Sequence, residues 1–153
     1  MTGWKKTAVL GSFLIVLFMG TIANGETLGD YMSATVCEGC HSDKADSWKQ
    51  TPHARAFDDL KKQGEDKQKN PGCLKCHVVG YGADGGYIDE ELTPELKNIQ
   101  CESCHGAGRK HTETMSAENI HGKPDEATCR NCHTESQDKN FDFAKKSQLV
   151  HSH

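Results

Sequence analysis

Four short stretches decide how this chain folds: Cys37-Glu38-Gly39-Cys40-His41, Cys73-Leu74-Lys75-Cys76-His77, Cys101-Glu102-Ser103-Cys104-His105 and Cys129-Arg130-Asn131-Cys132-His133. They use all eight cysteines of the chain, and every Cys-x-x-Cys pair is followed by a histidine. The chain has nine histidines among 153 residues, so four such followers arise by chance with a probability on the order of 10⁻⁵. The pattern Cys-x-x-Cys-His is typical of covalent c-type haem attachment.

The spacing of the motif suits that chemistry. Two thiols three residues apart lie on one side of a helical turn, where both can add to the vinyl groups of one porphyrin. The histidine that follows can then bind the iron. We therefore predict four covalently attached haems. The predicted attachment residues are Cys37, Cys40, Cys73, Cys76, Cys101, Cys104, Cys129 and Cys132, and the predicted iron ligands on the same motifs are His41, His77, His105 and His133.

Three other uses of paired cysteines compete with this interpretation. A framework of disulfides suits a small exported chain, but it gives no reason for a histidine after each pair. Structural zinc sites use Cys-x-x-Cys units without needing the same histidine four times. A thioredoxin-like redox motif would occur once, within a βαβ unit that this sequence lacks. Haem attachment therefore explains the pattern best.

The sixth position of each iron needs a second ligand. Only two methionines, Met32 and Met115, follow residue 25, so His/Met ligation cannot serve four haems. Five further histidines are available, and they are His53, His111, His121, His151 and His153. This supply predicts mainly His/His coordination and low-potential haems. We favour His53 and His111 as ligands and leave the other three open.

The N-terminus has the pattern of a secretory signal. Lys5 and Lys6 precede an apolar run over residues 8–19, and Ala23 and Gly25 place small residues before a cleavage point ahead of Glu26. We predict a signal peptide over residues 1–25 and one tetrahaem domain over residues 26–153, periplasmic or secreted. The apolar run falls short of the roughly 20 residues that span a bilayer. The sequence therefore predicts no stable membrane insertion after cleavage, and an uncleaved anchor is the alternative.

The predicted mature domain is poor in large apolar residues. Only 16 of its 128 residues, about 12%, are Leu, Ile, Val or Phe, which is typical of a disordered chain. Four porphyrins would replace the missing core, and an apoprotein without them is expected to be unfolded. From residue 26 on, 16 basic residues against 22 acidic ones give 16 − 22 = −6. This charge argues against nucleic-acid binding and favours redox partners with a basic docking surface.

Local patterns predict a mainly α-helical chain with long loops. The expected elements are a helix over residues 42–50, a helix from His53 to about Leu60 that ends near Gly64, a loop over residues 78–86, helix starts at Thr93-Pro94-Glu95 and at Lys123-Pro124-Asp125-Glu126, and a helix over residues 141–148. The start at Thr93 is expected to lead into the third motif. No strand pattern of useful length occurs.

Further residues around the motifs resemble one known family. They are Ser47-Trp48-Lys49, Thr51-Pro52-His53-Ala54-Arg55-Ala56-Phe57, Gly80-Tyr81-Gly82, Gly85-Gly86-Tyr87 and Gly106-Ala107-Gly108. With the four motifs, this series is similar to the cytochrome c-554 family of exported tetrahaem cytochromes, first known as electron acceptors of hydroxylamine oxidoreductase. The resemblance covers nearly all of residues 26–153. It implies a mainly α-helical fold wrapped around four closely packed haems.

The resemblance also implies a set of ligand pairs. His53 would lie opposite His133 on the fourth haem, and His111 would lie opposite His41 on the first. His151 or His153 would face His105. The second haem, on His77, would be five-coordinate, although His121 is a spare that could close it. In filament-forming relatives a distal histidine can come from a neighbouring subunit.

Three functions follow from these expectations. The leading one is an electron carrier rather than an enzyme. A structural alternative is a subunit of an extracellular haem-lined homo-oligomer or filament. An enzymatic alternative is reduction of a small nitrogen oxide at a five-coordinate second haem.

Overall fold

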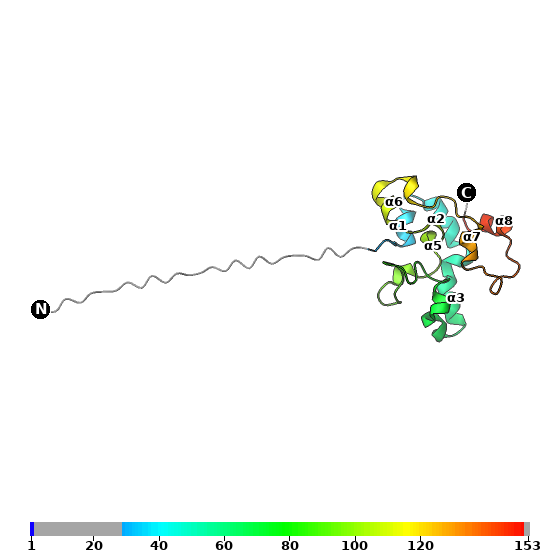
Figure 1. The fold of residues 1–153 in the computed structure, drawn as a ribbon, viewed down its shortest axis with the longest axis horizontal. Coiled ribbons are helices and arrows are strands. Elements are labelled where there is room, and N and C mark those ends of the chain that lie inside the picture. The colour runs from blue at the N-terminus through cyan, green and yellow to red at the C-terminus, as the bar shows by residue number, and fades with distance from the viewer. Residues whose placement is uncertain (2–28, 152–153) are drawn as a thin grey trace.

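The computed structural model describes residues 29–151 together with Met1. The signal peptide predicted over residues 1–25, apart from Met1, and the candidate ligand His153 lie outside the described residues. The described chain is built from short helices and the loops between them (Figure 1). The α-helices are α1 (Ala34–Glu38), α2 (Ser42–Lys49), α3 (Ala56–Lys62), α4 (Pro71–Leu74), α5 (Cys101–His105), α6 (Arg109–Thr114), α7 (Glu126–Arg130) and α8 (Phe143–Lys146).

Five 3₁₀ helices supplement them. They are η1 (Pro52–Arg55), η2 (Glu65–Lys69), η3 (Pro94–Leu96), η4 (Ala117–Asn119) and η5 (Ser147–Leu149). Within residues 29–151 there is no strand, and β pairing is limited to a bridge between Val78 and Lys97. The prediction of a mainly α-helical fold is confirmed. Figure 1 shows α5 near the middle of the molecule, with α6 at one end and α3 at the other.

Side-chain caps start several of the short helices. Asn70 accepts a hydrogen bond from the Gly72 amide at the start of α4, where Pro71 supplies a preset φ. Asp125 accepts from Thr128 at the start of α7, and Asp142 accepts from Lys145 at the start of α8. Helices of four or five residues gain little from propensity alone, so these caps fix where each begins.

Most of the predicted helices occur close to their expected bounds. Helix α2 ends one residue before the predicted limit at Gln50. The expected helix from His53 consists of η1 followed by α3, and the chain turns at Gly64 with φ of 126°. The loop predicted over residues 78–86 is present, and α8 with η5 takes the place of the expected C-terminal helix.

The helix expected to lead from Thr93 into the third motif is a wrong prediction. Only the single turn η3 forms there, and Lys97 is extended. Asn98 then takes a positive φ of 71°, which breaks any helical path. Its side chain accepts a hydrogen bond from the Phe57 amide at 2.8 Å, so a tertiary contact overrides the local helix signal.

The polypeptide has one apolar cluster of its own. It contains Phe57, Leu60, Leu74, Val78, Val79, Tyr87 and Leu96, with Tyr31, Cys73 and Tyr81 packed against it. Its members come from α3, α4, the loop after the second motif and η3. The expectation that four porphyrins replace the missing core is therefore incomplete, because this cluster already buries Phe57 and Val79 almost fully.

Glycine is required where the loop after the second motif closes. A Cβ at Gly86 would lie 1.8 Å from the carbonyl oxygen of Gly80. The neighbouring Gly85 has a φ of 70°, a conformation that other residues rarely adopt. This tight turn brings the amide of Tyr87 to the carbonyl of Val79 at 2.9 Å and so places Tyr87 in the cluster.

The longest helix of the described chain has eight residues. Across residues 29–151, none of the helices has the length and apolar character that crossing a bilayer requires.

Candidate functional site

Each Cys-x-x-Cys-His motif forms one helical turn. The amides of His41 and His133 donate to the carbonyls of Cys37 and Cys129, both at 2.9 Å. The second motif closes with a tighter turn, in which the Cys76 amide donates to the Cys73 carbonyl at 3.1 Å and the His77 amide donates to the Leu74 carbonyl at 2.9 Å. The third motif is α5 itself. None of the eight cysteines, all of which lie within residues 29–151, is paired in a disulfide. The paired thiols and the histidine therefore have the local backbone that the sequence predicts.

Cysteines of different motifs lie close together. Cys37 of the first motif is hydrogen-bonded to Cys101 of the third, which raises the pKa of Cys37 and lowers that of Cys101. Burial raises the pKa of Cys132 to about 12, and a hydrogen bond with Cys76 adds to the shift. Burial also raises the pKa of Cys104 to about 11, with a smaller contribution from nearby Cys129. Motifs one and three, two and four, and three and four are thus neighbours.

Three pairs of histidine rings face each other across the chain. The ring centroids of His41 and His111 are 6.4 Å apart, and those of His105 and His151 are 6.1 Å apart, with the rings within 26° of parallel. The centroids of His53 and His133 are also 6.1 Å apart, at an interplanar angle of 62°. Each pair joins one motif histidine to one of the spare histidines singled out in the sequence.

These separations fit two ligands on opposite faces of one iron. Imidazole nitrogens bind transition metals at about 2.0 Å and the ring centre lies about 1.1 Å behind the nitrogen, so two axial imidazoles have centroids about 6.2 Å apart. The three observed distances, from 6.1 to 6.4 Å, match that value. Two rings that stack directly, with no metal between them, have no reason to keep this same centroid distance in all three pairs. The residues present therefore fit haem coordination.

In His77, His105 and His111, a hydrogen bond at Nδ1 leaves Nε2 available. The Nδ1 atoms of His77 and His105 lie 2.6 Å from the carbonyl oxygens of Ala56 and His121, respectively. The Nδ1 of His111 lies 2.9 Å from the carbonyl oxygen of Ser116. A carbonyl can only accept, so Nδ1 carries the proton in each case and Nε2 is free to bind iron.

Burial keeps two of the histidines neutral. It lowers the pKa of His53, with a smaller contribution from His133, and it also lowers the pKa of His105. A neutral imidazole is the form that binds a metal.

The remaining candidates differ in their surroundings. Within residues 29–151, no second histidine ring faces His77. His121 is exposed and contacts the third motif through its backbone, because its amide donates to the His105 carbonyl at 3.0 Å and its own carbonyl accepts from the His105 ring. The possibility that His121 closes the second haem stays a prediction.

Two buried polar side chains hold the third motif in place, and neither was predicted from the sequence. Glu102 accepts hydrogen bonds from the amides of Met32 and Gly108, both at 2.7 Å. Gln100 accepts from the amide of Ala34 at 2.6 Å. The hydrogen bonds from Met32 and Ala34 join α5 to the start of the described chain, so they position α1 against α5. Neither Glu102 nor Gln100 has a pattern that would single it out, since Met32 and Ala34 lie 70 and 66 positions away in sequence.

The surroundings of His133 were also missed. The ring of Phe141 stacks on the imidazole with centroids 4.5 Å apart and an interplanar angle of 24°. The guanidinium of Arg130 lies 4.8 Å from the centre of the Phe141 ring. The carboxylate of Asp138 lies 3.0 Å from Nδ1 of His133. The loop after the fourth motif therefore encloses its histidine on several sides.

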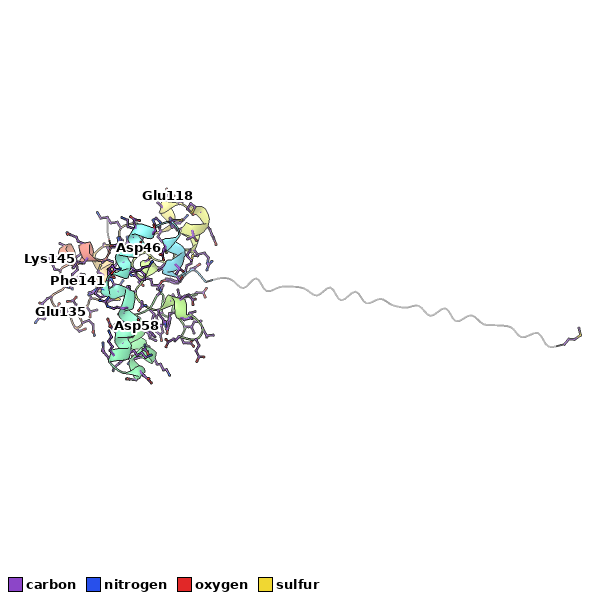
Figure 2. The ribbon with its side chains drawn as sticks, turned by 180° about the vertical axis from the view of Figure 1, so that it is seen from behind. Asp46, Asp58, Glu118, Glu135, Phe141 and Lys145 are labelled. Atoms are coloured by element: carbon purple, nitrogen blue, oxygen red, sulfur yellow. The ribbon has the colours of Figure 1, made fainter. Side chains whose placement is uncertain are left out.

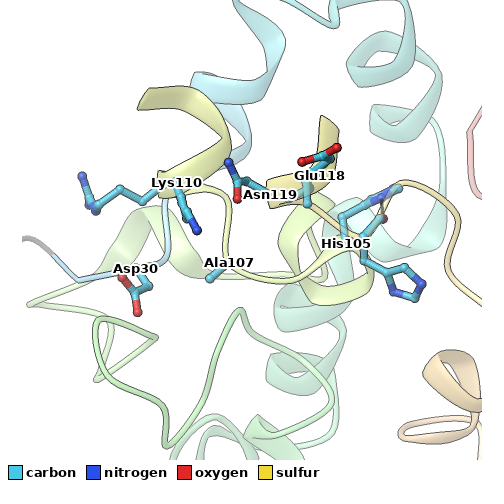
Figure 3. Close-up of a pocket in the computed structure, with 9 residues that line it drawn as sticks. Asp30, His105, Ala107, Lys110, Glu118 and Asn119 are labelled. Carbon is cyan, nitrogen blue, oxygen red and sulfur yellow. Dashed lines mark hydrogen bonds between the residues drawn. The ribbon is translucent and has the colours of Figure 1, made fainter. Parts of the chain in front are cut away.

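A shallow pocket of about 410 Å³ lies next to the third motif. Figure 3 shows the His105 ring on the opposite side of this pocket from Asp30 and Lys110. No cluster of three or more His, Cys, Asp or Glu side chains suited to a metal ion occurs in the part of the chain that the structure describes.

Comparisons with known proteins agree with this geometry. Residues 36–106 match the family described as cytochrome c554 and c-prime. Cytochrome c-554 of Nitrosomonas europaea is 36% identical over 112 residues, which cover 63% of this chain and 48% of that protein. The chain thus spans about half the length of this curated relative. The solved structure of reduced cytochrome c554 from Nitrosomonas europaea superposes with a TM-score of 0.58 at 28% identity, covering 80% of this chain and 83% of that one.

Proposed function

We propose that this chain belongs to the cytochrome c554 family and that it is an exported tetrahaem c-type cytochrome that transfers electrons between redox proteins. Membership implies covalent c-type haem and a role in electron transfer. The count of four haems, the ligand pairs and the export are our proposals. A bound c-type haem supplies a one-electron iron couple whose potential its axial ligands adjust.

One observation carries the proposal. Three motif histidines each face a histidine from elsewhere in the chain at 6.1–6.4 Å between ring centroids. Histidine on both faces lacks the methionine that raises the potential in cytochromes c, so these sites favour low potentials. His41 with His111, His53 with His133, and His105 with His151 are the proposed pairs. In this role the histidine side chains bind and orient the haems, and electron transfer requires no acid, base or nucleophile from them.

The contacts between cysteines support an order for the electron path. The side chains of Cys76 and Cys132 lie close together, as do those of Cys104 and Cys129 and those of Cys37 and Cys101. Porphyrins attached at these residues would be neighbours in the order two, four, three, one. The sequence of sites in space therefore differs from the sequence of motifs along the chain.

Charge favours a basic partner. The net charge of residues 26–153 is 16 − 22 = −6, and haem propionates would add to it. We expect an encounter that is small and transient, with a rate that falls as salt screens the charges.

The experiment uses the full chain matured in a host with a c-type haem attachment system. Mass spectrometry is expected to give four haem additions and a mature N-terminus at Glu26, and the reduced protein should pass electrons to an oxidised cytochrome partner with a basic surface. Fewer than four additions would contradict the tetrahaem proposal. A transfer rate that does not fall with salt would contradict the charged encounter, and monomeric sedimentation would exclude the filament alternative.

A second candidate function rests on His77. No other histidine ring faces it within the described residues, so the second haem has no histidine assigned to its sixth position. A vacant position could bind and reduce a small nitrogen oxide. A high-spin ferric signal in the EPR spectrum is expected in that case, and an entirely low-spin spectrum would exclude the reductase.

A further inference from the structure

The loop after the fourth motif directs a carboxylate at the motif histidine. The amides of Gln137 and Asp138 donate to the carbonyl of Thr134 at 3.1 and 2.8 Å, and the amide of Phe141 donates to the carbonyl of Asp138 at 3.1 Å. These backbone bonds fold the loop back toward α7. The Asp138 carboxylate thereby reaches Nδ1 of His133 at 3.0 Å.

This acceptor differs in charge from the others. The Nδ1 atoms of His77, His105 and His111 face backbone carbonyl oxygens, which are neutral. Hydrogen bonds to an ionised acceptor are roughly twice as strong as neutral ones. A carboxylate on the far nitrogen of a metal-bound histidine also raises the basicity of the ligand. A more basic imidazole stabilises the oxidised iron and so lowers its midpoint potential.

The surroundings preserve the contact. Phe141 is 8% exposed and stacks on the His133 ring, so it limits water on that side. The side chains of His133 and Asp138 retain only 34% and 31% of their exposure. A hydrogen bond that is partly shielded from water keeps more of its electrostatic strength.

Arg130, whose guanidinium lies over the Phe141 ring, has partners of its own. Arg130 forms an ion pair with Glu126 at 3.1 Å and donates to the carbonyls of His133 and Phe141 at 3.2 Å. Its charge is therefore offset by Glu126, and its donors are taken up by backbone oxygens. Arg130 holds the loop in place while the Asp138 charge acts on the histidine.

We propose that Asp138 is a positioning residue that makes His133 a more strongly donating ligand and lowers the midpoint potential of the haem held between His53 and His133. This inference rests on the proposed function, because it requires a haem at the fourth motif. It assigns to this chain a residue that distinguishes one haem from the other three.

The test is a potentiometric titration of the holoprotein followed by EPR. Asp138→Asn is expected to raise the midpoint potential of one component of the titration. The expected change is about tenfold in the reduction equilibrium, which is about 59 mV for a one-electron couple. Asp138→Glu should recover part of the shift because it keeps the carboxylate. Asp138→Ser, a second neutral variant, should raise the same component.

Glu135→Gln is the matched control. Glu135 lies on the same loop and is exposed, on the same flank of the molecule as Phe141 (Figure 2). The Glu135→Gln substitution removes one negative charge from the same loop, as Asp138→Asn does, but it leaves the hydrogen bond between Asp138 and His133 in place. If Glu135→Gln shifts the component as far as Asp138→Asn does, a general charge effect is responsible and the inference is wrong.

The component that shifts in Asp138→Asn must also belong to the haem on the fourth motif. His53→Met should move the same component as Asp138→Asn, because both residues act on one haem. A correct count of four haems with no shift in Asp138→Asn overturns the inference and leaves the proposed function intact. A protein without haem at Cys129 and Cys132 overturns both.

Discussion

The imidazole rings of His41 and His111 lie 23° from parallel with centroids 6.4 Å apart, although one precedes α2 and the other belongs to α6. The loop after α6 fixes the second ring, because Nδ1 of His111 lies 2.9 Å from the Ser116 carbonyl.

The first prediction follows from this pair. His111→Ala should remove one axial ligand and convert one haem from low-spin to high-spin, while the other three are unchanged. EPR and visible absorption spectra of the oxidised holoprotein measure the change. His121→Ala is the matched control, since its backbone carbonyl still accepts from His105. A high-spin signal created by His121→Ala would instead identify His121 as a ligand.

The second prediction concerns the ligand on the fourth motif. His53→Met should raise the midpoint potential of one haem and leave the other three nearly unmoved, because thioether ligation favours reduced iron. A redox titration followed optically resolves the components. If none of them shifts, His53 is not a ligand.

The third prediction concerns the apolar cluster. Leu60 is 2% exposed and belongs to the cluster, whereas Leu92 is 67% exposed. Leu60→Ala should lower the free energy of unfolding of the holoprotein by about 2–5 kcal/mol. Leu92→Ala, the same change at an exposed site, should alter it by no more than about 0.5 kcal/mol. Urea titrations followed by far-UV circular dichroism measure both, and equal losses would show that the cluster does not stabilise the fold.

The fourth prediction is a pH dependence at Glu102. Burial raises the pKa of this carboxyl above 4.5, while hydrogen bonds from the amides of Met32 and Gly108 partly oppose the shift. The folded protein therefore binds a proton at Glu102 more readily than the unfolded chain. This contribution to stability is fully present below pH 4.5 and is lost as the pH rises through the folded-state pKa.

Glu102→Gln tests that sign, because glutamine does not ionise. The variant loses one acceptor at every pH, so it should be less stable than wild type in acid. Its free energy of unfolding relative to wild type should then rise as the pH is raised from 4.5 through the folded-state pKa. Urea midpoints measured across this range for both proteins give the difference. A difference that stays constant with pH would contradict the assignment.

Part of this molecule could be predicted from its sequence. Cys-x-x-Cys-His is a local pattern, so the helical turn at each motif follows from neighbours along the chain. The shortage of methionines pointed to histidine as the second ligand, with five candidates. In the structure His53 and His111 each lie opposite a motif histidine. Family resemblance supplied the same pairs.

The rest depended on contacts between distant residues. The helix expected from Thr93 does not form because Asn98 bonds to the amide of Phe57. Nothing in the local sequence distinguishes Glu102 from an exposed charged residue. In the structure it is buried and accepts hydrogen bonds from the amides of Met32 and Gly108. Such contacts have no signature in local propensity, which reads only neighbouring residues.

The proximity of the fourth motif to both the second and the third has a consequence for maturation. Chains are made from the N-terminus onward, so Cys129 and Cys132 are the last attachment residues to emerge. Cys132 lies by Cys76, and Cys129 lies by Cys104. With four haems attached as proposed, a molecule loaded at the first three motifs alone would lack the site that lies next to both the second motif and the third. The proposed electron path would then be completed only at the final attachment step, although such a molecule would already carry most of its cofactor.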